Sequence, residues 1–332
     1  MPSIKSATMS RLEVQALLAA DLKRVEKAIA TDSICSVEAV TAIGHHLQKS
    51  GGKRLRPALL LLSAGTCGYR CDAAIRLGAV VEIIHAATLV HDDVIDEAKV
   101  RRGQPSINQR WGNQASVLAG DWLYMQAFSL ALRERNFDVL DLLIELTQMM
   151  VEGELMQMDW VGRIDLTEDE HLSLVHRKTA YLFSVCARMG AILAGADSKQ
   201  EQRLGDYGWN LGMAFQLVDD LLDFTASEEV LGKPVGNDLS EGKVTLPLIL
   251  VLQQCGKEEK KMVETVMSDQ SYDRVSLPSV LGLLNKYDAI ETVRRRALTY
   301  TETAAAQLEA FSDSSYKRAL TSVTEWVVDR ES

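Results

Sequence analysis

The sequence predicts an all-α fold, and three observations support this prediction. Proline is rare, with none between Pro105 and Pro234. Apolar residues recur at three- and four-residue spacing, as they do between Leu18 and Ile29, which indicates amphipathic helices. Strand signals are weak, because no sustained apolar–polar alternation and no Asn-Gly hairpin turn occurs. We therefore expect one large helical bundle domain that covers residues 1–332.

The composition excludes several classes of protein. Of the 332 residues, 47% are hydrophobic and 25% are charged, and the net charge is −10. An acidic chain of this kind is not expected to bind nucleic acid in general, because affinity for the phosphate backbone needs a cationic surface. The five cysteines form no CxxC pair and indicate reduced thiols. No stretch approaches 18 continuous apolar residues, so we expect a soluble, cytoplasmic protein without a transmembrane segment.

The segment Gly78–Ala98 is predicted to be a core helix, because it is apolar nearly all round. Six residues of this segment fall on one stripe about 140° wide on a helical wheel. They are Glu82, His85, Thr88, Asp92, Asp93 and Asp96. A buried carboxylate is costly unless it is paired or binds a cation. The stripe therefore indicates a site for a metal ion or a cationic ligand.

The segment Gly205–Phe224 repeats this pattern. Gln216, Asp219, Asp220 and Asp223 share a stripe about 100° wide. Three glycines, at positions 205, 208 and 212, extend the stripe toward the start of the helix. Each costs about 1 kcal/mol relative to alanine, so they indicate either close helix packing or the wall of a substrate channel.

Both stripes contain the pattern DDxxD, at residues 92–96 and 219–223. The pattern places carboxylates one helical turn apart on one face. Mg²⁺ prefers oxygen ligands and is usually held by a few carboxylates together with substrate phosphates. A single DDxxD is often a solvated helix face, but two copies inside apolar helices favour a Mg²⁺-dependent enzyme that acts on a diphosphate.

Basic residues cluster in short segments that could bind phosphate. Residues 51–57 read GGKRLRP, a glycine turn that leads into a helix with proline in its first turn, and a helix start with added Lys and Arg suits a phosphate group. Further basic segments lie at 101–102, 176–179, 232–233 and 243. Between them, Thr167 and Glu170 fit a capping box at the start of a helix.

Taken together, these motifs resemble those of the trans-isoprenyl diphosphate synthases, also called polyprenyl synthetases, and in particular their medium- and long-chain members. The resemblance spans about three-fifths of the chain, in the order and spacing that the family uses. The matching segments are GGKRLRP (51–57), EIIHAATLVHDDVIDEAKVRRGQP (82–105), HRKTA (176–180), FQLVDDLLDF (215–224) and GKPVGNDLSEGKVTLP (232–247).

The resemblance implies an all-α isoprenoid synthase fold around a central cavity, a homodimer, and Mg²⁺ as cofactor. The implied reaction condenses isopentenyl diphosphate with an allylic diphosphate. Asp92, Asp96 and Asp219 are implied as the main metal ligands, assisted by Asp93, Asp220 and Asp223. Arg101, Lys178 and Lys233 are implied to bind the allylic diphosphate, and Lys53, Arg56, His85 and Arg102 the isopentenyl diphosphate. Thr179 and Gln216 are implied to face the reacting carbons, with Lys243 near the diphosphates.

The implied mechanism ionises the allylic diphosphate, so water must be kept from the carbocation. No dedicated base stands out for the final proton loss, and our hypothesis is that the departing diphosphate takes the proton.

Product length is predicted from Ala87 and Thr88, which lie just before the first aspartate motif. Position 88 is about 6 Å below Asp92 along the helix. Short-chain members of the family have bulky aromatics at these two positions, whereas both residues are small here. We therefore expect a product longer than C15, between C30 and C50. Leu143, Leu146, Met149 and Met150 are candidates for the floor of the tunnel.

Four alternatives stay open. A geranylgeranyl diphosphate synthase would share the motifs and make a shorter product. A di-iron carboxylate bundle would use Glu-x-x-His pairs, which occur at Glu82–His85 and Glu168–His171. A class I terpene cyclase would not need a second DDxxD or the GGKRLRP segment. A non-catalytic subunit of a heteromeric synthase would be expected to have lost motif residues, and none is missing here.

Overall fold

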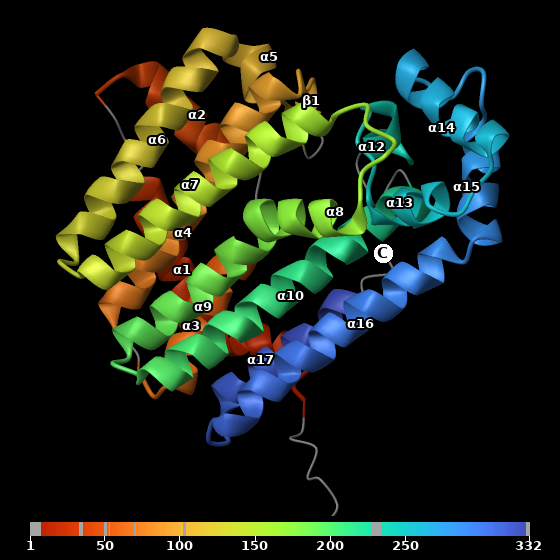
Figure 1. The fold of residues 1–332 in the computed structure, drawn as a ribbon. Helices are drawn as coiled ribbons and strands as arrows, with labels where there is room; N and C mark the ends of the chain where they lie inside the picture. Colours follow the sequence, from red (N-terminus) through yellow and green to blue (C-terminus); the bar gives the residue numbers. More distant parts are fainter. Residues whose placement is uncertain are drawn as a thin grey trace, which may run out of the picture. The chain divides into compact units, whose positions relative to one another are not determined.

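The computed structural model describes residues 8–32, 36–49, 52, 54–69, 71–101, 104–227 and 234–329. Over these residues the elements are helices apart from one very short hairpin, so the predicted all-α fold class is confirmed (Figure 1). The hairpin pairs β1 (Val100–Arg101) with β2 (Gln104–Pro105) in antiparallel register. This hairpin was not predicted from the sequence, because two-residue strands are too short to show alternation.

The described helices in the first half of the chain are α1 (Arg11–Asp32), α2 (Glu38–Lys49), α3 (Leu55–Thr66), α4 (Asp72–Ile95), α5 (Ile107–Trp111), α6 (Asn113–Arg133) and α7 (Phe137–Trp160). The chain continues through α8 (Glu168–Val175), a π-helical turn η1 (His176–Ala180), α9 (Tyr181–Leu193), α10 (Ser198–Thr225), α12 (Asn237–Ser240) and α13 (Leu246–Leu252). The last elements are α14 (Lys257–Asp269), α15 (Leu277–Lys286), α16 (Ala289–Gln307), the 3₁₀ turn η2 (Leu308–Ala310) and α17 (Ser315–Val328).

The chain divides into two compact units. The first comprises residues 1–145, 185–205 and 309–322, and the second comprises residues 146–184, 206–308 and 323–332. The first aspartate motif belongs to the first unit and the second motif to the second unit.

Helix α4 forms the core of the first unit and packs against α1, α3 and α6. It runs from Asp72 to Ile95, so it begins six residues before the predicted segment and ends three residues earlier. Most of its apolar residues are buried, as the sequence predicted, whereas Ile95 at its end is exposed. By length and hydropathy α4 could also cross a membrane, but 67% of its most apolar window is buried inside the structure, as in the core helix of a globular unit.

The second unit has its core around α13, in which all seven residues are buried. Helix α13 packs against α8, α15 and α16 (Figure 1). Helix α8 starts at the predicted capping box: Thr167 accepts from the Glu170 N–H, and the Glu170 carboxylate accepts from the Thr167 N–H. This cap fixes where α8 begins, and therefore where the π-helical turn that follows it lies.

Candidate functional site

The first aspartate motif lies at the C-terminal end of α4. The helix ends at Ile95, so Asp96 is its C-cap residue rather than part of a helix that continues to Ala98. The Asp96 N–H still donates to the Asp92 carbonyl oxygen at 2.8 Å, which keeps the two residues one turn apart. Asp92 is half-buried and Asp96 is exposed, whereas Asp93 is buried. The motif therefore presents Asp92 and Asp96 toward the surface of the first unit.

The hairpin after α4 brings a cation back to this motif. Arg101 in β1 donates from Nε to Oδ1 of the buried Asp93 at 2.5 Å. The hairpin thus joins two residues that the sequence analysis assigned to different tasks, metal binding and diphosphate binding. Arg102 lies outside the described residues.

The start of α3 carries a second pair of charges. Arg54, the N-cap residue, has a left-handed backbone with φ of 49°, and its Nη1 donates to Glu82 Oε1 of α4 at 2.8 Å. Both side chains are only 11% exposed. Arg56 is half-buried in the first turn of α3, ahead of Pro57, and His85 is half-buried on α4.

The Arg54–Glu82 pair gives Glu82 a partner that the sequence analysis did not find, although Glu82 stood on the predicted stripe. Lys53 lies outside the described residues.

These contacts argue against a di-iron centre. Arg54 pairs with Glu82, and Arg296 forms an ion pair with Glu168, so an arginine binds the carboxylate of each Glu-x-x-His pair. Within the described parts of the chain, no three His, Cys, Asp or Glu side chains gather into a preformed metal site.

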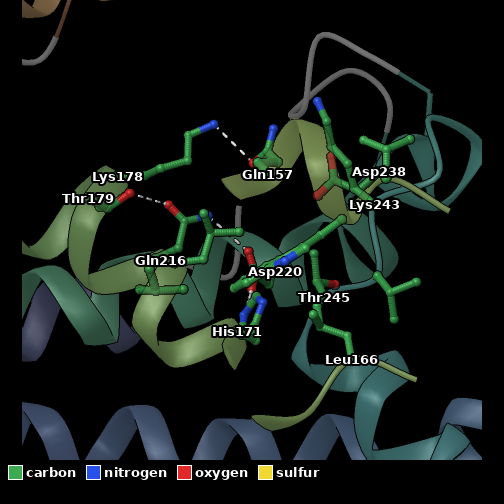
Figure 2. Close-up of a pocket in the computed structure, with 15 residues that line it drawn as sticks. Gln157, Leu166, His171, Lys178, Thr179, Gln216, Asp220, Asp238, Lys243 and Thr245 are labelled. Carbon is green, nitrogen blue, oxygen red and sulfur yellow. Dashed lines mark hydrogen bonds and ion pairs between the residues drawn. The ribbon is translucent and has the colours of Figure 1, made fainter. Parts of the chain in front are cut away.

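The second unit contains a pocket of about 210 Å³ that brings together five of the predicted site residues. They are Lys178, Thr179, Gln216, Asp220 and Lys243, which come from η1, α10 and the segment before α13 (Figure 2). Apolar residues such as Trp160, Leu166 and Val175 complete the wall. These five positions are spread over 66 residues of sequence, so only the tertiary fold could show that they share one cavity.

The HRKTA segment enters this pocket as a π-helical turn. Residues His176–Ala180 form η1 between α8 and α9. Such wide turns occur mostly as single insertions and often lie at functional sites. Trp209 Nε1 donates to His176 Nδ1 at 2.8 Å, which ties the turn to α10. A Cβ at Gly153 would come within 2.9 Å of the Lys178 side chain, so glycine at this position gives the turn room beside α7.

Lys178 and Thr179 reach different partners from the turn. Lys178 Nζ lies 2.6 Å from Glu154 Oε2 and 3.0 Å from Gln157 Oε1, both on α7. Thr179 Oγ1 donates to Gln216 Oε1 at 2.8 Å (Figure 2). Lys178 thus contacts α7 and Thr179 contacts α10, and both residues line the pocket.

A chain of hydrogen bonds continues from Gln216 into the interior. Gln216 Nε2 donates to Asp220 Oδ1 at 2.9 Å, and His171 Nε2 lies 3.0 Å from Asp220 Oδ2. Asp220 is 2% exposed and His171 is 4% exposed. In the sequence, His171 stood out only as part of a Glu-x-x-His pair, so its place beside the second aspartate motif is a finding of the structure.

The third aspartate of the second motif is hydrogen-bonded to α12. Asp223 is buried, and its carboxylate accepts from the Asp238 N–H at 3.2 Å. Tyr272 donates to the Gly236 carbonyl oxygen at 2.7 Å, and burial, with Asp223 and Asp238 nearby, raises the pKa of Tyr272, so its hydroxyl keeps its proton. Asp219 is half-buried. Lys233 lies outside the described residues.

The glycines of α10 serve helix packing. A Cβ at Gly208 would come within 2.5 Å of the Phe183 carbonyl oxygen, and a Cβ at Gly212 within 2.6 Å of the Ala180 Cα. Both neighbours are backbone atoms that cannot easily move away. Of the two interpretations of these glycines, close packing is therefore the correct one for Gly208 and Gly212.

The two predicted chain-length residues differ in their surroundings. Ala87 is fully buried, whereas Thr88 is half-buried and donates to the His85 carbonyl oxygen at 2.8 Å. Among the candidates for the tunnel floor, Leu143 and Leu146 are fully buried, as core residues are.

The fold and these motifs match one known family. The family model described as polyprenyl synthetase matches residues 37–284, about three-quarters of the chain. The chain belongs to the polyprenyl synthetase family. Members of this family are prenyltransferases of isoprenoid biosynthesis, so the resemblance seen in the motifs is confirmed.

Individual relatives agree with this assignment. The chain is 38% identical to the octaprenyl diphosphate synthase of Escherichia coli over 323 residues, which cover 97% of this chain and 100% of that protein. It is also 38% identical over 278 residues to the geranylgeranyl diphosphate synthase of Sulfolobus acidocaldarius, covering 82% of this chain and 84% of that protein.

A solved structure supports the fold of this chain. The crystal structure of a polyprenyl synthase from Caulobacter crescentus, complexed with calcium and isoprenyl diphosphate, superposes with a TM-score of 0.92 at 34% identity. The superposition covers 98% of this chain and 99% of the Caulobacter crescentus chain.

Proposed function

We propose that this chain condenses isopentenyl diphosphate with an allylic diphosphate to give an all-trans polyprenyl diphosphate of C30 to C50. The observation that carries this proposal is the pocket of the second unit. There a lysine and a hydroxyl from η1 and a carboxamide and a carboxylate from α10 line one cavity beside apolar side chains (Figure 2). A prenyl diphosphate has an anionic head group and an apolar chain, so its binding site needs both polar or charged and apolar lining residues.

The cations divide between the two substrates. Lys178 is held by Glu154 and Gln157 at the pocket wall, where it can exchange a carboxylate for a phosphate oxygen. With Arg101 and Lys233 it is assigned to the allylic diphosphate. Lys243, whose Nζ lies 2.8 Å from Glu241, lines the same pocket near the diphosphates. The site for isopentenyl diphosphate is assigned to Lys53, Arg56, His85 and Arg102.

The carboxylates fit a hard cation such as Mg²⁺. Asp92, Asp96 and Asp219 are at least partly exposed, whereas Asp93, Asp220 and Asp223 are buried and accept hydrogen bonds within their own units. We therefore assign direct metal contacts to the first three and an anchoring task to the other three. Bound Mg²⁺ would offset the negative charge that develops on the leaving diphosphate.

The residues of the chain itself supply orientation and shielding. Thr179 and Gln216 are assigned to the reacting carbons, since their side chains face the pocket and hold each other at 2.8 Å. Fixed dipoles in a water-poor site stabilise developing charge more strongly than water does. Apolar residues around the cavity keep water away from the carbocation.

The metal assignment is tested with Asp92→Ala and Asp219→Ala in a turnover assay with Mg²⁺. Each variant is expected to lose at least about 100-fold in kcat, on the order of the loss that follows removal of a group that stabilises a transition state. Asp141→Ala, which changes an exposed aspartate of α7, serves as the control and is expected to leave kcat unchanged. Near wild-type turnover in Asp92→Ala or Asp219→Ala would refute the assignment.

Product length is the finer part of the proposal. Small residues at Ala87 and Thr88, together with the similarity to an octaprenyl diphosphate synthase, support a product of C30 to C50. The equal identity to a geranylgeranyl diphosphate synthase supports a C20 product as the second candidate. Elongation assays with C10, C15 and C20 primers, with the products sized by mass spectrometry, decide between the two.

We also propose a homodimer, because apolar residues are exposed at seven-residue spacing on two helices. On α6 these are Leu118, Met125 and Leu132, and on α7 they are Phe137, Ile144, Val151 and Met158. Such a repeat forms one stripe along a helix and favours packing against another helix. Sedimentation velocity should show a dimer that Met125→Asp weakens; a monomeric wild type at micromolar concentration would contradict the proposal. We also propose that the protein is cytoplasmic, as expected from its reduced cysteines.

A further inference from the structure

His171 is a buried titratable residue for which the proposed reaction has no task. It lies on α8, one turn after the capping box, and 4% of it is exposed. Its Nε2 atom lies 3.0 Å from Asp220 Oδ2, and its ring lines the same pocket as Lys178 and Thr179 (Figure 2). A histidine placed behind an aspartate of the second motif calls for an explanation.

The carboxylate of Asp220 fixes the direction of the three hydrogen bonds that link His171, Asp220, Gln216 and Thr179. A carboxylate only accepts hydrogen bonds, so the groups at its two oxygens must both be donors. His171 therefore presents Nε2–H to Oδ2, and Gln216 presents its amide nitrogen to Oδ1. Once the amide nitrogen of Gln216 is used in this way, its carbonyl oxygen has to face the Thr179 hydroxyl.

We propose that His171 is a positioning residue that fixes the orientation of Gln216 by holding Asp220. The inference rests on the proposed function, in which Gln216 and Thr179 face the reacting carbons. With His171 in place, Asp220 has one donor on each oxygen and cannot rotate without losing one. Gln216 is then held in a single orientation, with its oxygen toward Thr179 and the pocket.

Loss of the His171 donor would remove this constraint. A buried carboxylate with an unmatched oxygen rotates toward other donors, because an unsatisfied buried polar group is costly. Gln216 would then lose its fixed partner and could turn its amide toward Thr179. Misplacement by about 1 Å of a group that positions the substrate can reduce a rate about 100-fold.

The test compares two amides that differ only in reach. His171→Gln can place an N–H donor near the position of Nε2, whereas the side chain of His171→Asn is too short to reach Asp220. We expect His171→Asn to lower kcat about 100-fold with the KM of both substrates within about twofold, and His171→Gln to recover kcat to within about fivefold of wild type. If His171→Asn does not fold, His171→Leu takes its place with the same expectation. Equal losses in the short and long variants, or wild-type kcat in a folded short variant, would overturn the proposal.

Two further variants separate positioning from stability. The double variant His171→Asn/Gln216→Leu should be no slower than Gln216→Leu alone, because residues that act through one another are not additive. Losses that multiply would overturn the proposal. Tyr287→Phe removes a 2.7 Å hydrogen bond to Glu259 elsewhere in the second unit and should leave kcat unchanged.

Crystal structures give a readout that does not depend on activity. The separation of Gln216 Nε2 and Asp220 Oδ1, 2.9 Å here, should exceed about 3.5 Å in His171→Asn and return in His171→Gln. If the wild-type chain elongates no primer, the proposed function fails, and these structures alone decide whether His171 positions Gln216. An unchanged Asp220–Gln216 contact in the short variant would overturn the inference.

Discussion

Replacement of Gly212 by alanine is expected to impair both packing and catalysis. Gly212 lies on α10 against Ala180, the last residue of the π-helical turn. An added Cβ would stand 2.6 Å from the Ala180 Cα and 3.2 Å from its Cβ. Ordinary van der Waals contact begins near 3.4 Å, so α10 and the turn have to separate by about 0.8 Å. The neighbouring residue in the turn is Thr179, and Gln216 is one helical turn along α10.

The separation can be translated into a loss of activity. The Thr179–Gln216 hydrogen bond is 2.8 Å long, and a shift of about 0.8 Å would lengthen it to about 3.6 Å, too long for a hydrogen bond. A shift of about this size costs about 100-fold in rate when it affects a group that positions the substrate. Overpacking costs about 1–3 kcal/mol in stability, of which alanine recovers about 1 kcal/mol through its higher helix propensity.

The assay measures kcat with isopentenyl diphosphate and a C15 primer, alongside thermal unfolding by circular dichroism. Gly282→Ala is the matched control, because a Cβ at Gly282 on α15 meets no atom within 4 Å. That variant should keep full activity and gain up to about 1 kcal/mol in stability. Wild-type kcat in Gly212→Ala would refute the argument that close packing at this position sets the Thr179–Gln216 contact.

Three other single substitutions should change product length, stability in urea and stability in acid. Thr88→Phe should shorten the main product, as measured by mass spectrometry; an unchanged product distribution would show that Thr88 does not face the growing chain. Glu82→Leu should lower the free energy of unfolding in urea by about 3 kcal/mol, because it leaves the nearly buried Arg54 with only the more distant carboxylate of Glu26, 3.7 Å away. The Lys286 ammonium, followed by the Tyr287 hydroxyl, lowers the pKa of Glu259 from 4.5 to about 2. This carboxylate therefore stabilises the fold above pH 4.5, and the contribution is lost as the pH falls toward 2. Glu259→Gln should flatten the acid dependence of stability in that range, and an unaltered pH profile would contradict the assignment.

The sequence was most informative where the pattern itself has a physical cause. Carboxylates on a buried apolar helix are stable only when they are paired with or bound to cations. The helices α4 and α10 and their aspartates could therefore be identified without a structure. The capping box at Thr167 was equally secure, because its two hydrogen bonds depend only on residues three apart. The end of α4 was placed three residues too late, since helix ends depend on local caps rather than on the apolar pattern.

The partners of these aspartates could not be read from the sequence. Nothing in the spacing of residues 171 and 220 indicates that a histidine on α8 stands behind the second motif, because contacts across 49 residues depend on how helices pack. The same holds for Arg54 and Glu82, which lie 28 residues apart. The glycines at positions 208 and 212 were ambiguous until the backbone of Phe183 and Ala180 was seen beside them.

The sequence by itself determined the helical class, the two aspartate motifs and the family to which the chain belongs, because periodicity and motif spacing are properties of the chain. Only the tertiary structure decided which aspartates are anchored and which face outward. It also decided that Lys178, Thr179, Gln216 and Asp220 share one pocket. The reason is that burial and hydrogen-bond geometry are properties of the packed helices, which bring together residues that the sequence keeps apart.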